Sequence, residues 1–267
     1  MKADTEERPD QQLTRSVAKA FSILQAFSER APRLSLSDLC ASVDLSPSTL
    51  RRLLATLESL GYVQHDSLGL YRLGGRALSL AAPALAGDEV RNQSLPVLED
   101  LSGATGGLNS NVGTLYEGRL LYLASVARNV TQRAFGVPGR LSALHSTALG
   151  KVMLAYRPME DAREIIEKGG GLVRRTPKTI ATWEDLEEEL ARVRERGYAV
   201  DDEEATAGGL CVAAPVRDRS AEVVAALSAS GMVWEISQSR IREIAAQVVS
   251  HALTLSYKLG YVLASEW

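Results

Sequence analysis

SPSTLRRLLATLESLGYV, residues 46–63, has the pattern of an amphipathic helix with a defined start and a defined end. Ser46 is a favourable N-cap, and Pro47 suits the first helical position, where its missing N–H costs nothing. Gly61 can end the helix in a left-handed conformation. The apolar residues of the stretch recur at helical spacing and form one stripe; they are Leu50, Leu53, Leu54, Leu57 and Leu60.

The segments on either side extend this pattern to a larger motif. Upstream, Ser35 can cap a short helix that has Asp38 in its first turn. A turn of about three residues joins the two helices, as in a helix-turn-helix. Downstream, residues 62–65 and 70–73 read as two strands joined by a tight turn. A helix-turn-helix followed by a β-hairpin predicts a winged helix.

The second helix of such a pair enters the DNA major groove by its N-terminal end. Hydroxyls there can reach phosphates or base edges, and arginine can pair with guanine or phosphate through two hydrogen bonds. Between residues 11 and 76, eight Lys and Arg stand against five Asp and Glu, although the whole chain has a formal charge of −3. The alternative is that the helix arginines are ordinary solvated charges. We predict contacts to double-stranded DNA by Ser46, Ser48, Thr49, Arg51, Arg52, His65 and Arg72.

Composition limits the class of protein further. The 267 residues suffice for two domains. Cys40 and Cys211 lie far apart and form no CxxC pair, which suits a reducing compartment. The N-terminal MKADTEERPDQQ is polar and lacks the apolar core of a signal peptide, and no stretch approaches the roughly 20 apolar residues that span a bilayer. We predict a soluble cytoplasmic protein without a membrane partner.

The pattern changes after the hairpin. RALSLAAPALA, residues 76–86, predicts an amphipathic linker helix with a break or kink at Pro83. Its apolar face has two interpretations, a contact between two chains or packing on its own domain. Beyond it, strands and helices alternate with hairpin connections, which predicts an α+β fold with a mostly antiparallel sheet flanked by helices. The expected organisation is a disordered N-terminus (1–12), a winged helix-turn-helix domain (13–75), a linker helix (76–90) and an effector-binding domain (91–267).

Six segments in this order resemble the IclR family of transcription regulators over nearly the whole chain. They are SVAKAFSIL (16–24), SPSTLRRLLATLESLGYV (46–63), YRLGGRALSLA (71–81), LHSTALGKVMLA (144–155), ERGYAVDDEEATAGGLCVAAPV (195–216) and VVAALSASG (223–231). The resemblance implies a DNA reader joined by a linker helix to a GAF-like domain that binds a small metabolite, often a carboxylate or an aromatic acid. It also implies homodimers or pairs of dimers that repress or activate transcription. The sequence departs from the family pattern at Lys19, where arginine is usual, and at Ser142–Ala143, where a proline-containing stretch is common.

The resemblance also implies an effector pocket. By motif match it comprises Leu141, Thr147, Ala148, Asp201, Cys211, Ser228 and Ser230, and Val130 is an apolar neighbour. Ser146 is a possible cap of the helix that follows, whose backbone donors would favour an anion. Each polar residue also has a structural interpretation. The serines can face solvent, Cys211 can be a small buried hydrophobe, and Asp201 can cap a turn.

Three other functions remain open at the level of sequence. An enzyme would use His145 with Cys211, or the acidic residues 201–204, but no GxSxG, HExxH or Walker pattern is present. A metal sensor would use His145, Cys211 and Asp201, which lack the close spacing of most metal sites. A protein-interaction module would use the winged helix without DNA. We expect a small-molecule-controlled DNA-binding regulator with no catalytic residues, no cofactor and no metal.

Overall fold

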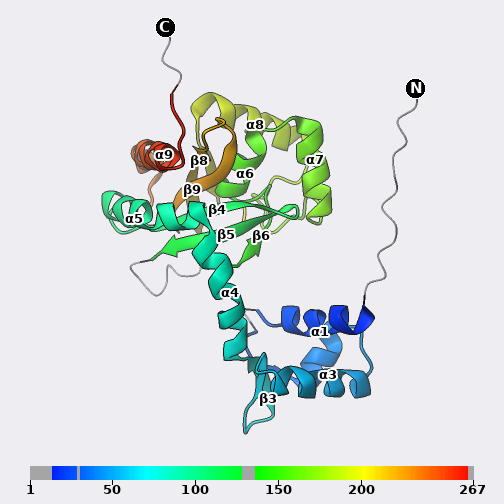
Figure 1. Ribbon diagram of the computed structural model, residues 1–267. Coiled ribbons are helices and arrows are strands. Elements are labelled where there is room, and N and C mark those ends of the chain that lie inside the picture. The colour runs from blue at the N-terminus through cyan, green and yellow to red at the C-terminus, as the bar shows by residue number, and fades with distance from the viewer. Residues whose placement is uncertain (1–13, 29–30, 128–135, 264–267) are drawn as a thin grey trace, which may run out of the picture. The chain divides into compact units, whose positions relative to one another are not determined.

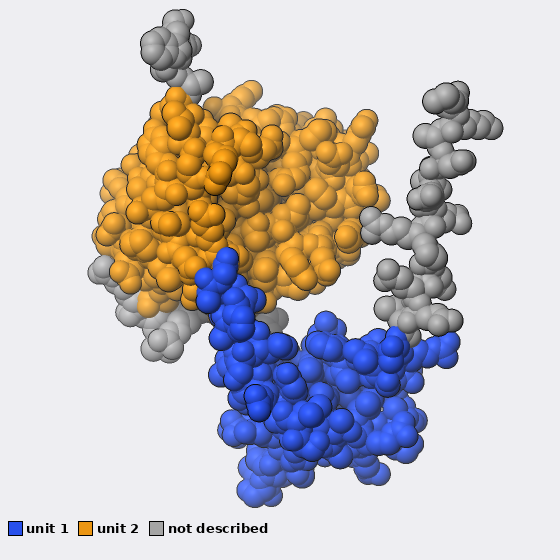
Figure 2. Space-filling model, viewed as in Figure 1, with its two compact units in different colours: residues 1–87 blue, residues 88–267 orange. Residues whose placement is uncertain are grey.

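The computed structural model describes residues 14–28, 31–127 and 136–263, and it divides into two units, Met1–Gly87 and Asp88–Trp267 (Figure 2). The disorder predicted for residues 1–12 and the pocket role predicted for Val130 lie outside the described residues. In the described part of the chain, no helix has the length and apolar character needed to cross a membrane.

The first unit is a winged helix, as predicted. Its elements are α1 (Arg15–Ala26), β1 (Leu34–Ser35), α2 (Leu36–Ser42), α3 (Pro47–Ser59), β2 (Val63–His65), β3 (Leu70–Leu73) and α4 (Gly75–Gly87). The strands form an antiparallel sheet in the order β1-β3-β2. Strand β1 was not predicted, because two residues carry no readable alternation. Both predicted caps are present: Ser35 and Asp38 form a capping box on α2, and Ser46 caps α3.

A small apolar core fixes the position of α3. Leu50, Leu54 and Leu57 of the predicted stripe are buried together with Ile23 of α1 and Leu39 of α2. Burial of side chains of this size contributes about 1.5–3 kcal/mol each. At the end of the helix the chain turns through Gly61, whose φ of 78° favours glycine. The core therefore holds one face of α3 and leaves the other face to solvent.

Helix α4 buries none of its side chains. It continues from Gly75 to Gly87 with Pro83 inside it, so of the predicted break or kink at Pro83 the break is wrong. A proline removes one backbone hydrogen bond, and the remaining helical bonds of the segment tolerate that loss. The side chains of Leu78 and Leu80 are 78% and 59% exposed. Within the described chain, this Ala- and Leu-rich helix therefore has an uncovered apolar surface.

The second unit is built on a six-stranded antiparallel sheet in the order β6-β5-β4-β9-β8-β7. Its strands are β4 (Asn109–Tyr116), β5 (Arg119–Val126), β6 (Leu141–Ser142), β7 (Ala199–Asp202), β8 (Gly209–Arg217) and β9 (Val223–Met232). Its helices are α5 (Glu89–Ala104), α6 (Ala148–Ala155), α7 (Met159–Lys168), α8 (Trp183–Arg196), the short η2 (Gln238–Arg240) and α9 (Ile241–Lys258). The predicted α+β class is confirmed.

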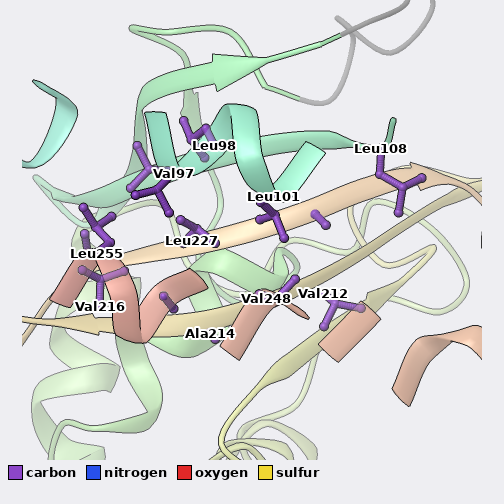
Figure 3. Packing of buried hydrophobic residues seen from close by; sticks show 14 of the residues in the cluster. Val97, Leu98, Leu101, Leu108, Val212, Ala214, Val216, Leu227, Val248 and Leu255 are labelled. Atoms are coloured by element: carbon purple, nitrogen blue, oxygen red, sulfur yellow. The ribbon is translucent and has the colours of Figure 1, made fainter. Parts of the chain in front are cut away.

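The two faces of this sheet are covered differently. Helices α5 and α9 pack on one face, and α6 lies on the other with α8 behind it (Figure 1). The α5/α9 face is a continuous apolar core, in which Leu98 and Leu101 of α5 pack with Leu227 of β9 (Figure 3). On the α6 face, apolar packing under the helices gives way to a group of polar side chains. This group is the candidate site of the second unit.

Candidate functional site

The exposed N-terminal end of α3 carries most of the predicted DNA contacts. Ser46 Oγ accepts from the Thr49 backbone N–H at 3.4 Å and donates to Thr49 Oγ1 at 2.9 Å. These two hydroxyls therefore fix the start of the helix. Ser48, Arg51 and Arg52 are exposed on the side of α3 away from its buried leucines. The helix thus presents two guanidinium groups and one hydroxyl to solvent beside its N-terminus.

The hairpin between β2 and β3 presents the other predicted contacts, His65 and Arg72, both of which are exposed. The His65 ring stacks on Tyr71 with 4.5 Å between ring centroids. Asp66 Oδ1 accepts hydrogen bonds from two backbone N–H groups of the turn. Its other oxygen lies 3.9 Å from Arg33. The wing is therefore ordered by its own side chains and carries Arg72 exposed on its surface.

In the second unit, strand register brings distant polar residues onto one face of the sheet. Asp201 pairs with Cys211, Cys211 with Ser230, and Ser230 with Asn109. A second row runs beside it, in which Ser228 pairs with Asn111 and Asn111 with Ser125. Directly opposed residues of an antiparallel sheet project from the same face. We call these seven residues the polar ladder: Ser125, Asn109, Asn111, Ser228, Ser230, Cys211 and Asp201.

Hydrogen bonds connect one half of the polar ladder. Ser125 Oγ donates to Asn109 Oδ1 at 3.1 Å, and Asn109 Nδ2 donates to Asn111 Oδ1 at 3.3 Å. Asn111 Nδ2 then donates to Ser228 Oγ at 3.3 Å and to Ser230 Oγ at 3.1 Å. The amide network orients the two serine hydroxyls that the sequence placed in the effector pocket. The sequence interpretation missed both asparagines and Ser125; the alternating Asn-Ser-Asn at the start of β4 was the available signal.

Gly136 packs closely against the side chain of Asn111 in the ladder. A Cβ atom at this position would lie 2.1 Å from Asn111 Oδ1 and 3.0 Å from the Tyr122 ring. Contacts below 3.0 Å do not occur for real Cβ atoms, so glycine alone allows the backbone this approach. Tyr122 is buried, and burial raises the pKa of its phenol above the usual value of 10. A neutral ring and a bare backbone therefore wall this end of the ladder.

Asp201 forms the opposite end of the ladder and is 7% exposed. Its Oδ1 accepts from the backbone N–H of Glu204 at 2.8 Å and of Ala205 at 3.2 Å, so it does cap the turn after β7. Burial raises the pKa of Asp201 to about 7, and the neighbouring charge of Glu204 adds to the rise. Lys151 opposes the rise but does not cancel it. Asp201 is therefore a turn cap and a buried acid at once.

A buried lysine lies behind this turn. Lys151 of α6 is 1% exposed, and its Nζ donates to Val200 O and to Glu204 Oε1, both at 2.5 Å. Glu189 Oε1 of α8 lies 3.4 Å from Lys151 Nζ. Burial raises the pKa of Glu204 despite this lysine, whereas the charges of Lys151 and Arg196 outweigh burial at Glu189 and lower its pKa. This ion network joins α6, α8 and β7; the sequence interpretation did not identify it.

The start of α6 differs from the prediction in one respect. Thr147, not Ser146, is the N-cap, and its Oγ1 accepts from the Gly150 N–H at 3.2 Å. Ser146 is fully buried, and its Oγ makes no hydrogen bond with the described residues. Thr147 and Ala148 are both buried where α6 meets the sheet.

Leu141 of β6 does not lie on the ladder face of the sheet. It pairs with Leu121 and is 41% exposed, and its neighbour Ser142 lies on the ladder face instead.

The geometry gives little support to catalysis. Burial raises the pKa of the Cys211 thiol to about 12, which disfavours the thiolate that a nucleophile needs. His145 Nε2 lies 3.1 Å from Val173 O, and burial lowers the pKa of the ring. Among the described residues, no group of three or more His, Cys, Asp or Glu is placed to hold a metal ion. The polar ladder is better suited to binding a small polar molecule than to transforming one.

A winged helix with a basic, exposed helix end, joined in one chain to a domain with a buried polar site, defines a DNA-binding transcription regulator that responds to a small molecule. Two family models match the chain, the IclR helix-turn-helix domain over residues 16–67 and the bacterial transcriptional regulator IclR C-terminal domain over residues 82–257. The chain therefore belongs to the IclR family, as its sequence motifs indicated.

Known relatives agree with this assignment. The HTH-type transcriptional regulator KdgR of Escherichia coli K12 is 35% identical over 97% of both chains. The crystal structure of a transcriptional regulator from Rhodococcus sp. RHA1 has a TM-score of 0.77 at 28% identity, covering 92% of this chain and 98% of that one. An IclR homologue from Microbacterium hydrocarbonoxydans, in complex with 4-hydroxybenzoate, shares the fold with a TM-score of 0.76 at 22% identity, covering 92% and 99%. KdgR and the Rhodococcus protein are both described as transcriptional regulators.

Proposed function

We propose that this protein is a cytoplasmic repressor that binds operator DNA as a homodimer and changes its DNA affinity when a small carboxylic acid occupies the polar ladder. The observation that carries the proposal is the buried, hydrogen-bonded ladder in the same chain as an exposed arginine pair at a capped helix start. Dimers can associate further into tetramers, as the family resemblance implies. Each part of the proposal has its own test.

The DNA reader consists of α3 and the wing. Arg51 and Arg52 are exposed beside the N-terminus of α3, where they can reach base edges or phosphates, and Arg72 can contact the backbone from the wing. We expect R52A to weaken operator binding by about 1–3 kcal/mol. R219A removes an exposed arginine from the second unit and is the matched control.

Fluorescence anisotropy with the DNA upstream of the gene, against a scrambled sequence and across a salt series, measures this binding. Preference for the upstream DNA, with an affinity that falls steeply as salt rises, is the expected result. Equal binding by wild type, R52A and R219A would contradict the assignment of α3 as the recognition helix.

The effector site consists of the ladder and the start of α6. Its hydroxyls and amides offer hydrogen bonds in a buried setting, and the first turn of α6 adds backbone donors and a favourable dipole for an anion. The complex of the Microbacterium homologue with 4-hydroxybenzoate supports an acid as the ligand class. Because Ser228 is fully buried in the ladder, S228L should crowd the site and abolish the response to acids. T254L, on the exposed face of α9, is the control.

The dimer contact is the apolar surface of α4. A helix of 13 residues without buried side chains is marginal in water unless another surface covers it, and Leu78 and Leu80 are its most exposed leucines. Pairing of two chains along α4 would place two recognition helices about 34 Å apart, in successive major grooves. Sedimentation of L78D should show a shift toward monomer, whereas an unchanged dimer would exclude α4 as the contact.

A further inference from the structure

Residues 169–182 connect α7 to α8 without a helix or strand. Leu172 and Ile180 pack against the apolar core on the α6 side of the sheet and so anchor this connection at two points. We call the segment between these anchors, residues 173–179, the strap. Connections of this length without secondary structure are uncommon in compact domains and often serve binding. The strap contacts two elements that border the polar ladder, the turn after β7 and the start of α6.

Threonines of the strap hold the backbone of the turn after β7. Thr179 is 2% exposed, and its Oγ1 donates to Glu204 O at 2.7 Å. The same oxygen accepts from the backbone N–H groups of Arg175 at 3.1 Å and Thr176 at 2.8 Å, which fixes the position of this hydroxyl. Thr176 Oγ1 donates to Glu203 O at 2.7 Å. Two consecutive carbonyl groups of the turn are therefore held by the strap.

The turn adopts a conformation that needs such support. Glu203 has a φ of 62°, in the left-handed region that residues with a Cβ atom adopt at a cost in energy. Lys178 of the strap donates to Glu203 Oε1 at 2.7 Å, and the Gly208 N–H donates to Oε2 at 2.7 Å. Because Lys178 is exposed, water screens its ion pair, and the buried hydrogen bond of Thr179 holds the turn more firmly. The shape of the turn therefore depends on the strap.

The strap also reaches the start of α6. Val173 O lies 3.1 Å from Nε2 of His145, which is 1% exposed and precedes the N-cap Thr147 by two residues. A carbonyl oxygen can only accept, so Nε2 carries the proton of this bond, and burial lowers the pKa of His145 and favours the neutral ring. Lys151 connects the same two elements one turn further along α6, because it donates to Glu204. The strap and the lysine together hold the helix start and the turn at a fixed separation.

The helix start and the turn border the polar ladder, and their separation limits the size of a ligand. The N–H groups of Glu204 and Ala205 cap Asp201 at the end of the ladder, so a shift of the turn shifts that end as well. A rigid site excludes an acid that is too large and leaves space beside one that is too small. A site whose end can move accepts both with similar affinity.

We propose that the strap determines the size of the acid that the effector site accepts, and that Thr176 and Thr179 are its positioning residues. This inference rests on the proposed function, because it concerns selectivity among acids at that same site. The two threonines act through the carbonyl groups of Glu203 and Glu204 and do not touch the ligand. Removing their hydroxyls frees the end of the ladder and leaves the hydrogen-bonding groups of the ladder in place.

The first test needs no ligand. Hydrogen exchange of the full chain, followed by mass spectrometry, compares wild type with T179V, which keeps the shape of the side chain and removes its hydroxyl. Exchange in peptides that cover residues 199–209 should become about five- to tenfold faster, as expected for the loss of one buried hydrogen bond. T114V is the matched control, since Thr114 Oγ1 donates to Val224 O at 2.8 Å elsewhere in the sheet. T114V should leave exchange in this segment unchanged, and T179S should restore the wild-type rate.

The second test measures selectivity. Calorimetric titration gives the affinities of propionate, benzoate and 2-naphthoate, which share a carboxylate and increase in size. In wild type, the strongest and weakest of the three should differ by about tenfold or more, because a pocket of fixed shape discriminates at this level. In T176V/T179V this ratio should fall to about threefold or less, and T179S should keep the wild-type ratio. A purely structural loss would lower all three affinities by the same factor and leave the ratio unchanged.

The outcomes separate the two proposals. An unchanged ratio in T176V/T179V, equal binding of the three acids by wild type, or unchanged exchange in T179V would each overturn the inference and leave the proposed function standing. If the double variant does not fold, T176V alone serves, since Thr176 is partly exposed and its change has the same expected direction. The absence of binding by all three acids in wild type would overturn both proposals.

Discussion

Replacing Lys151 by methionine tests the buried ion network behind the polar ladder. Methionine keeps the unbranched stem of lysine and removes the charge and its donors. Glu189 would retain Arg192 at 3.1 Å and Arg196 at 2.8 Å. Glu204 would lose Lys151, the one cation that pairs with it among the described residues, and Val200 O would lose a donor. K151M should therefore lower the free energy of unfolding mainly because Glu204 is left without its lysine partner.

The size of that cost follows from the protonation of Glu204. Removing one partner of a buried ion pair destabilises a fold by about 3–5 kcal/mol. Glu204 can avoid part of this cost by taking a proton, since burial already raises its pKa from the usual 4.5. Holding it neutral at pH 7 costs about 3.4 kcal/mol relative to the unfolded chain, at 1.36 kcal/mol per pKa unit. The loss should therefore reach about 3 kcal/mol at pH 7 and shrink to below about 1 kcal/mol at pH 5.

Urea unfolding followed by tryptophan fluorescence measures this loss in the full chain. All three tryptophans, Trp183, Trp234 and Trp267, lie in the second unit, so the signal reports on the domain that contains Lys151. K151M/E204M should recover most of the wild-type stability, because an apolar pair replaces a buried ion pair at little cost. K178M, which removes an exposed lysine from two ion pairs on the neighbouring turn, should scarcely change the curve.

Two results would refute this reasoning. A loss for K151M that does not change between pH 5 and pH 7 would mean that Glu204 does not carry the cost. A loss below about 1 kcal/mol at pH 7 would mean that water replaces the lysine, so that the network is not buried in solution.

Three further predictions concern the second unit. The folded pKa of Asp201 is raised, so its stabilising effect is complete below the unfolded value of 3.8 and is lost as the pH rises through about 7. The free energy of unfolding of D201N should therefore rise relative to that of wild type by up to about 4 kcal/mol between pH 4 and pH 8, measured by urea unfolding. L101A should cost about 2–5 kcal/mol in the same assay, since Leu101 is fully buried under the sheet, and a smaller cost would mean that the core closes around the cavity. G136A should weaken acid binding but leave DNA affinity without ligand unchanged, because its Cβ would displace the Asn111 amide; unaltered calorimetric affinity would contradict this.

Local features of the fold could be predicted from the sequence because neighbouring residues determine them. Ser46, Pro47 and Gly61 mark the two ends of α3 within one segment, and the structure confirms all three. The choice between Ser146 and Thr147 as the cap of α6 was wrong, because both residues suit the role. Only the backbone path decides which hydroxyl reaches the Gly150 N–H. Two adjacent hydroxyl residues in a sequence do not determine that path.

The candidate site was only partly predictable, because strand register assembles it. Motif resemblance supplied Asp201, Cys211 and the two serines of the ladder, but not Asn111, which lies 117 positions from Ser228. Lys151 meets Glu204 across 53 positions, and nothing in an Ala- and Leu-rich helix marks a buried lysine as paired. Long-range pairs of this kind leave no periodicity, so single-sequence reasoning cannot find them. Leu141 shows the reverse case, since the register moves it away from the ladder face.

The unequal faces of the six-stranded sheet affect how such a domain can diversify. Leu98, Leu101 and Leu227 pack on the α5/α9 face, on the opposite side of the sheet from the polar ladder, so substitutions within the ladder leave this apolar core in place. Exchanges among small polar residues on the ladder side would change hydrogen-bonding chemistry and remove little apolar contact. Such a scaffold can acquire a new chemical preference by a few substitutions while its folding stability, and its attached DNA reader, remain intact.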